Sequence, residues 1–198
     1  TTTATELLFL KYMLDSLRPG GRCGVIVPEG VLFGSTGAHK ELRRQLIENN
    51  RVESVLSLPG GVFQPYSGVK TSVLFFRKGG STSRVLFLHA DDDGYKLDAN
   101  HDTPIEADDL PGLARVYAQR ESAWDQWTAR DAAAEWGEKW WFADAAALRA
   151  NDANLSAGRY RPMSQAQVEH RDPRELLDEL AAIETEISAE VEALRLAL

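Results

Sequence analysis

The side chains that commonly perform catalysis are scattered along this chain, and few stand at a spacing that would let them act together. The four histidines lie far apart, and none pairs with a cysteine or glutamate at metal-ligand spacing. Asp91 to Asp93 precede a glycine, but the later acids of an EF-hand loop are missing, so we expect a solvated turn. Ser35 and Ser67 lie near glycines but outside a hydrolase nucleophile elbow. The glycine-rich phosphate-binding motifs Gly-x-x-x-x-Gly-Lys and Gly-x-Gly-x-x-Gly are also absent.

The start of the chain predicts one helix followed by one strand. Thr3 and Glu6 stand at the spacing of a capping box with Thr3 as the N-cap residue. Leucines then recur at helical spacing, at Leu7, Leu10, Leu14 and Leu17. A Pro-Gly-Gly stop at residues 19–21 ends this helix. Residues 22–28 are apolar almost without alternation, which is typical of a strand covered on both faces in a parallel sheet.

The rest of the first 80 residues continues this alternation. Residues 38–49 predict a helix, and 52–58 and 70–77 predict two strands. Helix, strand, helix, strand, strand is the latter half of an open α/β sheet. Two glycine-containing loops, 29–37 and 59–69, follow strands. Because an open doubly wound sheet binds ligands at the carboxyl ends of its strands, we expect both loops at that edge.

Residues 81–162 are less regular. Residues 84–90 predict one more strand and residues 109–128 a helix. All five tryptophans fall between Trp124 and Trp141. We expect them to hold a loop-rich segment against the sheet rather than to stack on bases.

The end of the chain predicts a long helix that begins near Pro173, with Asp172 as its N-cap. Its apolar residues form one narrow seam at coiled-coil spacing: Leu176, Leu180, Ile183, Ile187, Val191, Leu194 and Leu198. Residues 172–198 hold eight acids against two arginines. An acidic helix with one apolar seam favours a partner helix; the alternative is that the helix folds back on its own domain.

Composition and charge limit the classes of protein. With 198 residues, 43% of them hydrophobic and 26% charged, the chain is an ordinary globular sequence without a membrane-length apolar run. It lacks the features of a signal peptide, and its one cysteine, Cys23, makes no internal disulfide, so a cytoplasmic location is expected. The net charge of −8 argues against a free-standing DNA-binding protein. However, residues 1–80 hold ten Lys/Arg against six Asp/Glu, a net +4, so the first part is the one suited to a polyanion.

The most informative feature is a series of short phrases in a fixed order. They are Phe9-Leu10-x-x-Met13-Leu14-x-x-Leu17-x-Pro19-Gly20-Gly21-Arg22, Val25-Ile26-Val27-Pro28-Glu29-Gly30-Val31-Leu32-Phe33-Gly34, Lys40-x-Leu42-Arg43-x-x-Leu46, Leu58-Pro59-x-Gly61-Val62-Phe63, Gly68-Val69-Lys70-Thr71-Ser72-Val73-Leu74-Phe75-Phe76, Asp93-Gly94-Tyr95-x-Leu97-Asp98, Asp109-Leu110-Pro111 and Asn151-Asp152-x-Asn154-Leu155-Ser156-x-x-Arg159-Tyr160. Together they resemble the methyltransferase (M) subunit of type I restriction-modification systems, which are N6-adenine DNA methyltransferases. Ala153 departs from the pattern, since the family usually has an aromatic residue there.

The resemblance implies the latter half of a Rossmann-like methyltransferase sheet, an irregular segment and a long C-terminal helix. Such enzymes bind S-adenosylmethionine with a Phe-x-Gly-x-Gly loop and act through Asn-Pro-Pro-Phe or Asn-Pro-Pro-Tyr, and neither motif occurs here. In the family's order both precede the opening helix, so the chain is interpreted as the C-terminal part of an M subunit. No catalytic or cofactor-binding residue is expected in it, and we expect the 198 residues alone to be inactive.

The resemblance also implies a site and partners. The loop before the third strand would form the far wall of the target-base pocket. Phe63 and Tyr66 would face a flipped base, and Lys70 with Thr71 would hold a phosphate; alternatively, Phe63 belongs to the core and Lys70 is merely solvated. The implied partners are DNA, a specificity subunit on the seam, and a restriction subunit. The expected regions are 1–80, 81–171 and 172–198.

Two other classes of function stay open. One is a non-catalytic α/β assembly module whose role is the contact made by the C-terminal helix. The other is a methyltransferase acting on a small molecule or a protein, which the acidic seam helix argues against.

Overall fold

The structure is a computed structural model in which residues 4–129, 138–162, 184 and 187 are described. The chain divides into two compact units, Thr1–Ser164 and Gln165–Leu198. In the second unit, the described residues Glu184 and Ile187 are helical, and the side chain of Ile187 is exposed. The other predicted seam residues lie outside the described residues: Leu176, Leu180, Ile183, Val191, Leu194 and Leu198. The seam therefore stays a prediction.

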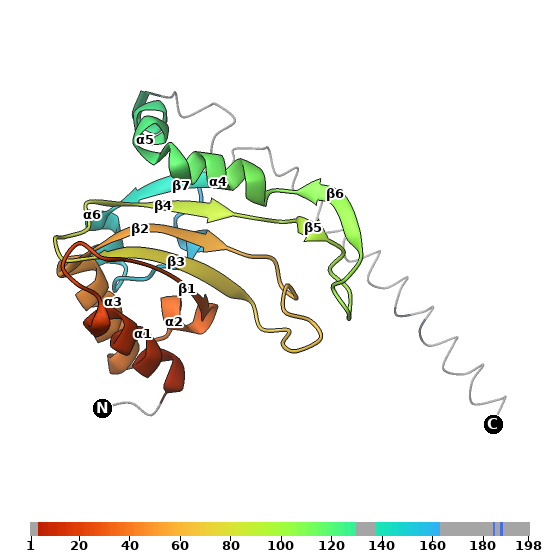
Figure 1. The fold of residues 1–198 in the computed structure, drawn as a ribbon, viewed down its shortest axis with the longest axis horizontal. Coiled ribbons are helices and arrows are strands. Elements are labelled where there is room, and N and C mark those ends of the chain that lie inside the picture. Colours follow the sequence, from red (N-terminus) through yellow and green to blue (C-terminus); the bar gives the residue numbers. More distant parts are fainter. Residues whose placement is uncertain (1–3, 130–137, 163–183, 185–186, 188–198) are drawn as a thin grey trace. The chain divides into compact units, whose positions relative to one another are not determined.

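The first unit contains seven strands and seven helical segments in its described residues (Figure 1). The helices are α1 (Thr5–Ser16), α2 (Glu29–Phe33), α3 (Gly37–Glu48), α4 (Leu110–Ala118), α5 (Arg120–Ala129), α6 (Ala145–Ala150) and the 3₁₀ turn η1 (Ala157–Arg159). The strands are β1 (Arg22–Pro28), β2 (Asn50–Ser57), β3 (Thr71–Lys78), β4 (Arg84–His89), β5 (Asp93–Tyr95), β6 (Pro104–Asp108) and β7 (Trp140–Asp144).

Five of these strands form one mixed sheet in the order β1-β3-β2-β4-β7. β3 runs antiparallel to both of its neighbours, β2 runs parallel to β4, and β7 is antiparallel to β4. β1, β2 and β4 therefore point the same way, and their carboxyl ends meet at one edge. The loops after β1 and β2 both leave from this edge, as the sequence predicts. The expected α/β class is confirmed.

The prediction that residues 22–28 form a strand is right, but the predicted surroundings of that strand are wrong. β1 pairs only with β3 within the described residues, and that pairing is antiparallel. Its first five residues alternate between exposed and partly buried positions, Ile26 is 51% exposed, and Val27 is the one buried residue of the strand. A continuous apolar run predicts burial on both faces, yet here the strand forms an open edge of the sheet.

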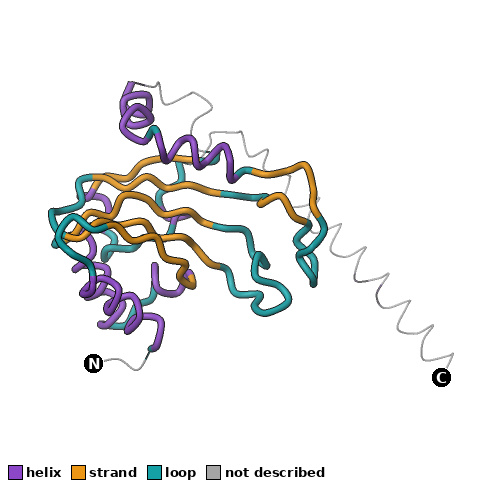
Figure 2. The backbone as a smooth tube through the Cα atoms, in the orientation of Figure 1, coloured by secondary structure: helices purple, strands orange, loops and turns teal. Residues whose placement is uncertain are grey.

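Helices cover both faces of the sheet (Figures 1 and 2). α1, α3 and α6 pack on one face with the segment 151–160, around a core centred on Leu10, Leu46 and Phe76. α4 and α5 pack on the other face around Leu86, Leu88 and Leu113. The four described tryptophans serve this packing: Trp141 is fully buried against the first core, and the others pack against the second. Their predicted packing role is confirmed for these four.

Local details differ from the sequence-based expectations in four places. The N-cap of α1 is Ala4 and no side chain caps the helix, so the capping box at Thr3 is wrong. The first loop contains the short helix α2, because Val31 and Leu32 are buried. The predicted turn after Asp91 becomes strand β5 at Asp93. The single helix predicted over 109–128 is two helices that meet at Gln119.

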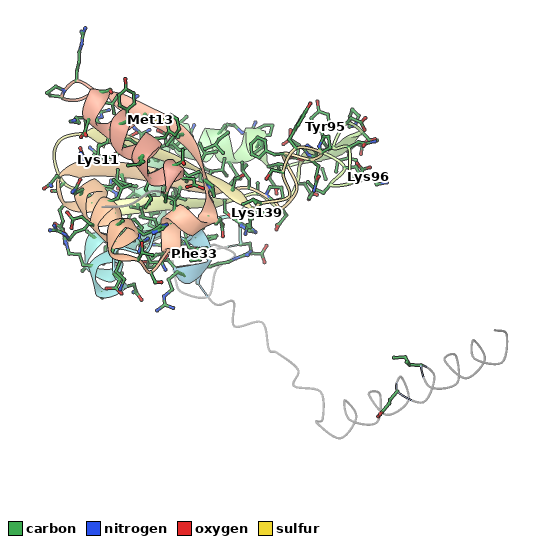
Figure 3. All side chains as sticks on the ribbon, turned by 90° about the horizontal axis from the view of Figure 1, so that it is seen from below. Lys11, Met13, Phe33, Tyr95, Lys96 and Lys139 are labelled. Atoms are coloured by element: carbon green, nitrogen blue, oxygen red, sulfur yellow. The ribbon has the colours of Figure 1, made fainter. Side chains whose placement is uncertain are left out.

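The expected boundary at residue 80 falls in the turn between β3 and β4, and the same sheet continues on both sides of it. β5 and β6 form a separate two-stranded hairpin. This hairpin projects from the sheet on the same side as the loop after β2 (Figure 1), and Tyr95 and Lys96 lie at its tip (Figure 3).

Candidate nucleic-acid interface

The loop between β2 and β3 carries exposed aromatic side chains at the carboxyl-end edge of the sheet. Backbone hydrogen bonds close it on itself: the N–H groups of Tyr66 and Ser67 donate to the carbonyl of Phe63 at 2.8 and 2.9 Å. Tyr66 is 94% exposed and Phe63 36% exposed, so neither belongs to the hydrophobic core. Both rings are therefore available to a flat ligand such as a nucleobase.

Lys70 and Thr71, at the end of this loop, lie in different surroundings. The Lys70 side chain is 45% exposed, and its Nζ lies 3.6 Å from a carboxylate oxygen of Glu29. Thr71 is buried, and no described residue offers a hydrogen-bond partner to its Oγ1 atom. Of the two, Lys70 is the one that reaches solvent.

A row of polar side chains crosses the sheet beside these residues. Ser72 lies opposite Ser57 on the neighbouring strand, and Ser57 lies opposite His89 on the next. Directly opposed residues share one face of a sheet. The Glu29 carboxylate, at the end of β1, accepts hydrogen bonds from the hydroxyls of Ser57 and Ser72 at 3.3 and 3.4 Å. Glu29, Ser72, Ser57 and His89 thus form one polar row along the carboxyl ends of the strands.

The polar row ends in a charged network at His89. Its Nε2 lies 3.0 Å from a carboxylate oxygen of Asp91, and Lys139 binds both Asp91 and Asp109. Asp109 also accepts hydrogen bonds from the backbone N–H groups of Asp91 and Asp92 at 2.9 and 3.2 Å. Figure 3 shows Lys139 at the base of the hairpin.

The pKa values in this network follow from its contacts. Burial lowers the pKa of His89 despite the opposing effect of Asp91, so the neutral imidazole is favoured. The hydrogen bond from Lys139 lowers the pKa of Asp91. Burial acts to raise the pKa of Asp109, but the hydrogen bonds from Lys139 and from the two backbone N–H groups lower this pKa overall. Burial acts to lower the pKa of Lys139, yet its hydrogen bonds to the two aspartates raise it. Lys139 and its two aspartates are thus charged at neutral pH.

The buried guanidinium of Arg43 holds the loops behind this edge. It donates to the carbonyls of Val31 and Gly34 at 3.2 and 2.9 Å, next to β1. It also donates to the carbonyls of Ala153 and Asp152 at 3.1 and 3.4 Å, where both residues have positive φ angles. Lys40 adds an ion pair with Asp152 at 2.8 Å. The loop after β1 and the segment around residue 152 are therefore fixed to each other through α3.

Sequence reasoning did not identify the polar row or Arg43 as parts of this edge. Glu29, Arg43 and Ser72 stand within the phrases of the family pattern, but Ser57 and His89 lie outside them, and no phrase indicates that Ser72 meets the other two. Only the register of β2, β3 and β4 places these three side by side.

The order of the phrases in the sequence has a counterpart among known proteins. The sequence profile described as N-6 DNA Methylase matches residues 1–170.

The chain belongs to the N-6 DNA methylase family.

Two curated relatives come from Escherichia coli. The methylase subunit of the type I restriction enzyme EcoKI, from strain K12, is 30% identical over 174 residues, which cover 83% of this chain and 32% of that protein. The methylase subunit of EcoEI is 41% identical over 96 residues, which cover 48% of this chain and 19% of that protein. The chain therefore spans about a third or less of these relatives.

A solved structure supports the same assignment. A protein chain from a study of assembly and conformational transition in a type I restriction-modification system superposes with a TM-score of 0.65 and 32% identity. The match covers 98% of this chain and 39% of that one. The sequence profile and the structural superposition thus assign this chain to the same family.

The described residues were also searched for a metal site and for a membrane-spanning helix. The described residues contain no group of three or more His, Cys, Asp or Glu side chains placed to bind a metal ion. Among the same residues, no helix combines the length and apolar composition needed to cross a membrane.

Proposed function

We propose that this chain is the C-terminal part of the modification subunit of a type I restriction-modification system, which transfers a methyl group from S-adenosylmethionine to N6 of adenine in DNA. Family membership supports the reaction class. The partial coverage of the relatives supports a part of the subunit rather than the whole.

The observation that carries this proposal is the open side of the first unit at β1. Ile26 on that strand is 51% exposed. Beside it, α1 exposes Phe9 (60%) and Tyr12 (70%), and α2 exposes Phe33 (52%). Figure 3 shows Met13 and Phe33 on this side of the molecule. An edge strand next to exposed large apolar side chains is unusual for a finished domain. A further strand and helix of the same methyltransferase sheet would cover both.

The cofactor loop and the Asn-Pro-Pro-aromatic motif are both missing from the 198 residues. The described residues therefore offer no loop for S-adenosylmethionine, and we assign the cofactor and the chemical step to a segment that completes the sheet. This chain contributes the wall of the site instead. Phe63 and Tyr66 stack on or enclose the flipped adenine, Lys70 neutralises a DNA phosphate, and Glu29 positions Lys70.

Thr71 is proposed as a weaker contributor than Lys70. Its hydroxyl is buried, so it contacts a phosphate only if the loop moves to expose it. The serines and histidine of the polar row lie beside it and supply further hydrogen-bonding groups at the same edge.

The test compares two lengths of protein. The 198 residues are expected to bind S-adenosylmethionine negligibly by calorimetry. The subunit extended to include a glycine-rich cofactor loop and an Asn-Pro-Pro-aromatic segment is expected to methylate adenine when mixed with its specificity subunit. Micromolar, stoichiometric binding of the cofactor by the 198 residues alone would contradict the proposed division of the site.

Lys70→Ala in the extended subunit tests the DNA edge. We expect affinity to fall alike for all sequences, with a salt dependence about one unit shallower, because a phosphate contact carries no base information. Lys11→Ala is the matched control, since Lys11 is paired with Asp15 on α1, away from this edge. A loss confined to cognate DNA would contradict the phosphate role.

The C-terminal seam is proposed as the contact with the specificity subunit. Ile183→Asp with Ile187→Asp places two charges in the predicted seam without shortening the chain. We expect size-exclusion chromatography to show loss of the complex while the melting temperature of the subunit is kept. An intact complex, or a collapsed melting temperature, would indicate instead that the seam packs within its own chain.

A further inference from the structure

A row of arginines crosses the sheet at the end opposite to the candidate nucleic-acid interface. Arg77 on β3 lies directly opposite Arg22 on β1 and directly opposite Arg51 on β2. Directly opposed residues share a face, so the three guanidinium groups lie side by side. Like charges in this arrangement destabilise a sheet unless something compensates them.

Two more arginines complete the cluster. Arg84, at the start of β4, makes a cation–π contact with Trp124 of α5 at 4.5 Å. Arg120, at the start of α5, makes another with Tyr117 of α4 at 4.9 Å. We call Arg22, Arg51, Arg77, Arg84 and Arg120 the arginine cluster. It lies on the face covered by α4 and α5.

A bulge in β2 supplies the main counter-charge. The register of β2 against β3 shifts between Val52 and Ser54, so Glu53 has no opposite residue on β3. A bulge re-aims a side chain, and here the Glu53 carboxylate lies 3.6 Å from Arg77 and 3.5 Å from Arg120. It also accepts a hydrogen bond from the Tyr117 hydroxyl at 2.9 Å.

The compensation is incomplete. Glu121 pairs with Arg51 and Arg84, and Asp144 lies opposite Arg84. The Asp144 carboxylate caps α6 by accepting a hydrogen bond from the Ala147 N–H, so Glu53 and Glu121 are the two carboxylates that pair with the cluster within the described residues. The Nε atoms of Arg77 and Arg120 are buried without a hydrogen-bond partner among the described residues. Arg22 is exposed and forms no ion pair within the part of the chain that the structure describes.

The position of the cluster separates it from the candidate nucleic-acid interface. Thr71 and Arg77 are six residues apart on one strand, which corresponds to about 20 Å. A duplex bound along the carboxyl-end edge would lie at the other end of the sheet. A guanidinium row suits carboxylates as well as phosphates, because each group forms paired hydrogen bonds with either.

We propose that the arginine cluster is a docking surface for an acidic protein surface, that of the restriction subunit. This inference rests on the proposed function, in which DNA takes the carboxyl-end edge and the specificity subunit takes the C-terminal seam. The restriction subunit is then the partner without an assigned surface. The positive excess at this end would steer and orient an acidic partner.

The experiment uses the full-length subunit with its purified specificity and restriction subunits and a DNA duplex that contains the target site. Arg22→Glu with Arg51→Glu reverses two charges of the cluster. We expect binding of the restriction subunit to weaken at least about tenfold, while DNA affinity and methylation stay unchanged. Arg22→Lys with Arg51→Lys should keep most of the binding, because the charges remain.

Two further variants serve as a control and as a milder form of the test. Arg44→Glu reverses one charge, as Arg22→Glu does, but on α3, which packs on the other face, and it should leave restriction-subunit binding within about twofold. Arg22→Glu alone disturbs no ion pair of the described structure and decides the question if the double variant fails to fold. It should weaken binding by a smaller factor.

Two results would overturn the proposal. Unchanged restriction-subunit binding by folded Arg22→Glu is one. Weakened DNA binding with intact restriction-subunit binding is the other, and it would assign the cluster to phosphates instead. Failure of the proposed function is distinguishable, because the wild-type subunit would then not methylate DNA at all.

Discussion

Each end of the sheet contains one buried charged residue, Arg43 at the carboxyl end and Glu53 at the amino end, and the two charges are compensated by different groups. At the carboxyl end, Arg43 is 2% exposed and its guanidinium donates to four backbone carbonyls. At the amino end, the Glu53 side chain is 3% exposed and lies between two guanidinium groups and a phenol. One charge is met by neutral dipoles and the other by opposite charges.

This difference indicates what each end is built for. Carbonyls that belong to different loops fix the shape of those loops, so Arg43 is suited to hold a binding edge in one conformation. Burial lowers the pKa of Arg43, while Asp152 and Tyr160 act to raise it. Side chains that are themselves partly exposed are instead available to other ions, so the Glu53 end is suited to a charged partner.

Arg43→Leu should have the largest effect on stability. It leaves carbonyls of the loop after β1 and of the 152 segment without their donor, and we expect a loss of about 3 kcal/mol. Chemical denaturation measures it, and faster hydrogen exchange around residues 151–155 should accompany it. The control is Arg44→Leu, whose side chain is 64% exposed and should cost less than about 0.5 kcal/mol. Equal effects of the two would mean that Arg43 does not hold the loops.

Glu53→Leu should come next, at about 2 kcal/mol. The change removes the counter-charge of Arg77 and Arg120, and a buried pair that loses one member is destabilised strongly. We set the figure below that of a fully buried pair because both arginines are partly exposed. Glu121→Leu, at a 65% exposed side chain, should cost less than about 1 kcal/mol in the same denaturation experiment. A Glu53 effect no larger than that control would show that the cluster needs no internal anion.

Tyr66→Ala tests whether the carboxyl-end edge of the sheet binds DNA. The ring is 94% exposed, so the melting temperature should not change. In the full-length subunit, loss of one stacking ring should weaken binding of target-containing DNA by about tenfold. Tyr95→Ala, on the acidic hairpin, is the matched control and should leave DNA affinity unchanged. Equal losses in the two variants would indicate a general contribution of exposed aromatic residues.

The smallest effect concerns pH at the carboxyl end. Burial lowers the pKa of His89 below its unfolded value of about 6.5. The unfolded state therefore binds the proton more readily, and the contribution of His89 to stability is full above pH of about 6.5 and declines as the pH falls below it. Wild type should lose more stability than His89→Gln between pH 8 and pH 5.5, by a fraction of the Glu53 effect. Parallel pH profiles would contradict a lowered pKa of the partly buried His89.

Much of the fold could be predicted because its signals are local. Apolar periodicity identified α1 and α3, and β-branched and aromatic runs identified β1 to β4 within a few residues. The family followed from short phrases in a fixed order, because the same backbone positions recur in its members. The capping box at Thr3 failed because a capping pattern states which side chain is suitable, not which residue ends the helix.

Only part of the candidate site could be predicted from the sequence. Phe63, Tyr66 and Lys70 could be proposed from the sequence because they lie within or directly after one loop, 59–69, and their role stays a proposal. Ser57, Ser72 and His89 were not, since they are separated by up to 32 residues and meet only through strand register. Glu53 could not be identified as a buried charge, because its position in the core depends on a bulge that no local pattern announces.

The amino-acid sequence by itself determined α1, α3 and β1 to β4 with their order along the chain, the family, and the absence of the cofactor and catalytic motifs. These follow from propensity, periodicity and short-range patterns, which act over a few residues. Tertiary structure alone decided that β1 is an open antiparallel edge. It also decided that five arginines gather at one end of the sheet while hydroxyls and an imidazole line the other. The physical reason is that pairing register and strand order are set by the packing of the whole core, and a shift of a single residue would turn every one of these side chains to the opposite face.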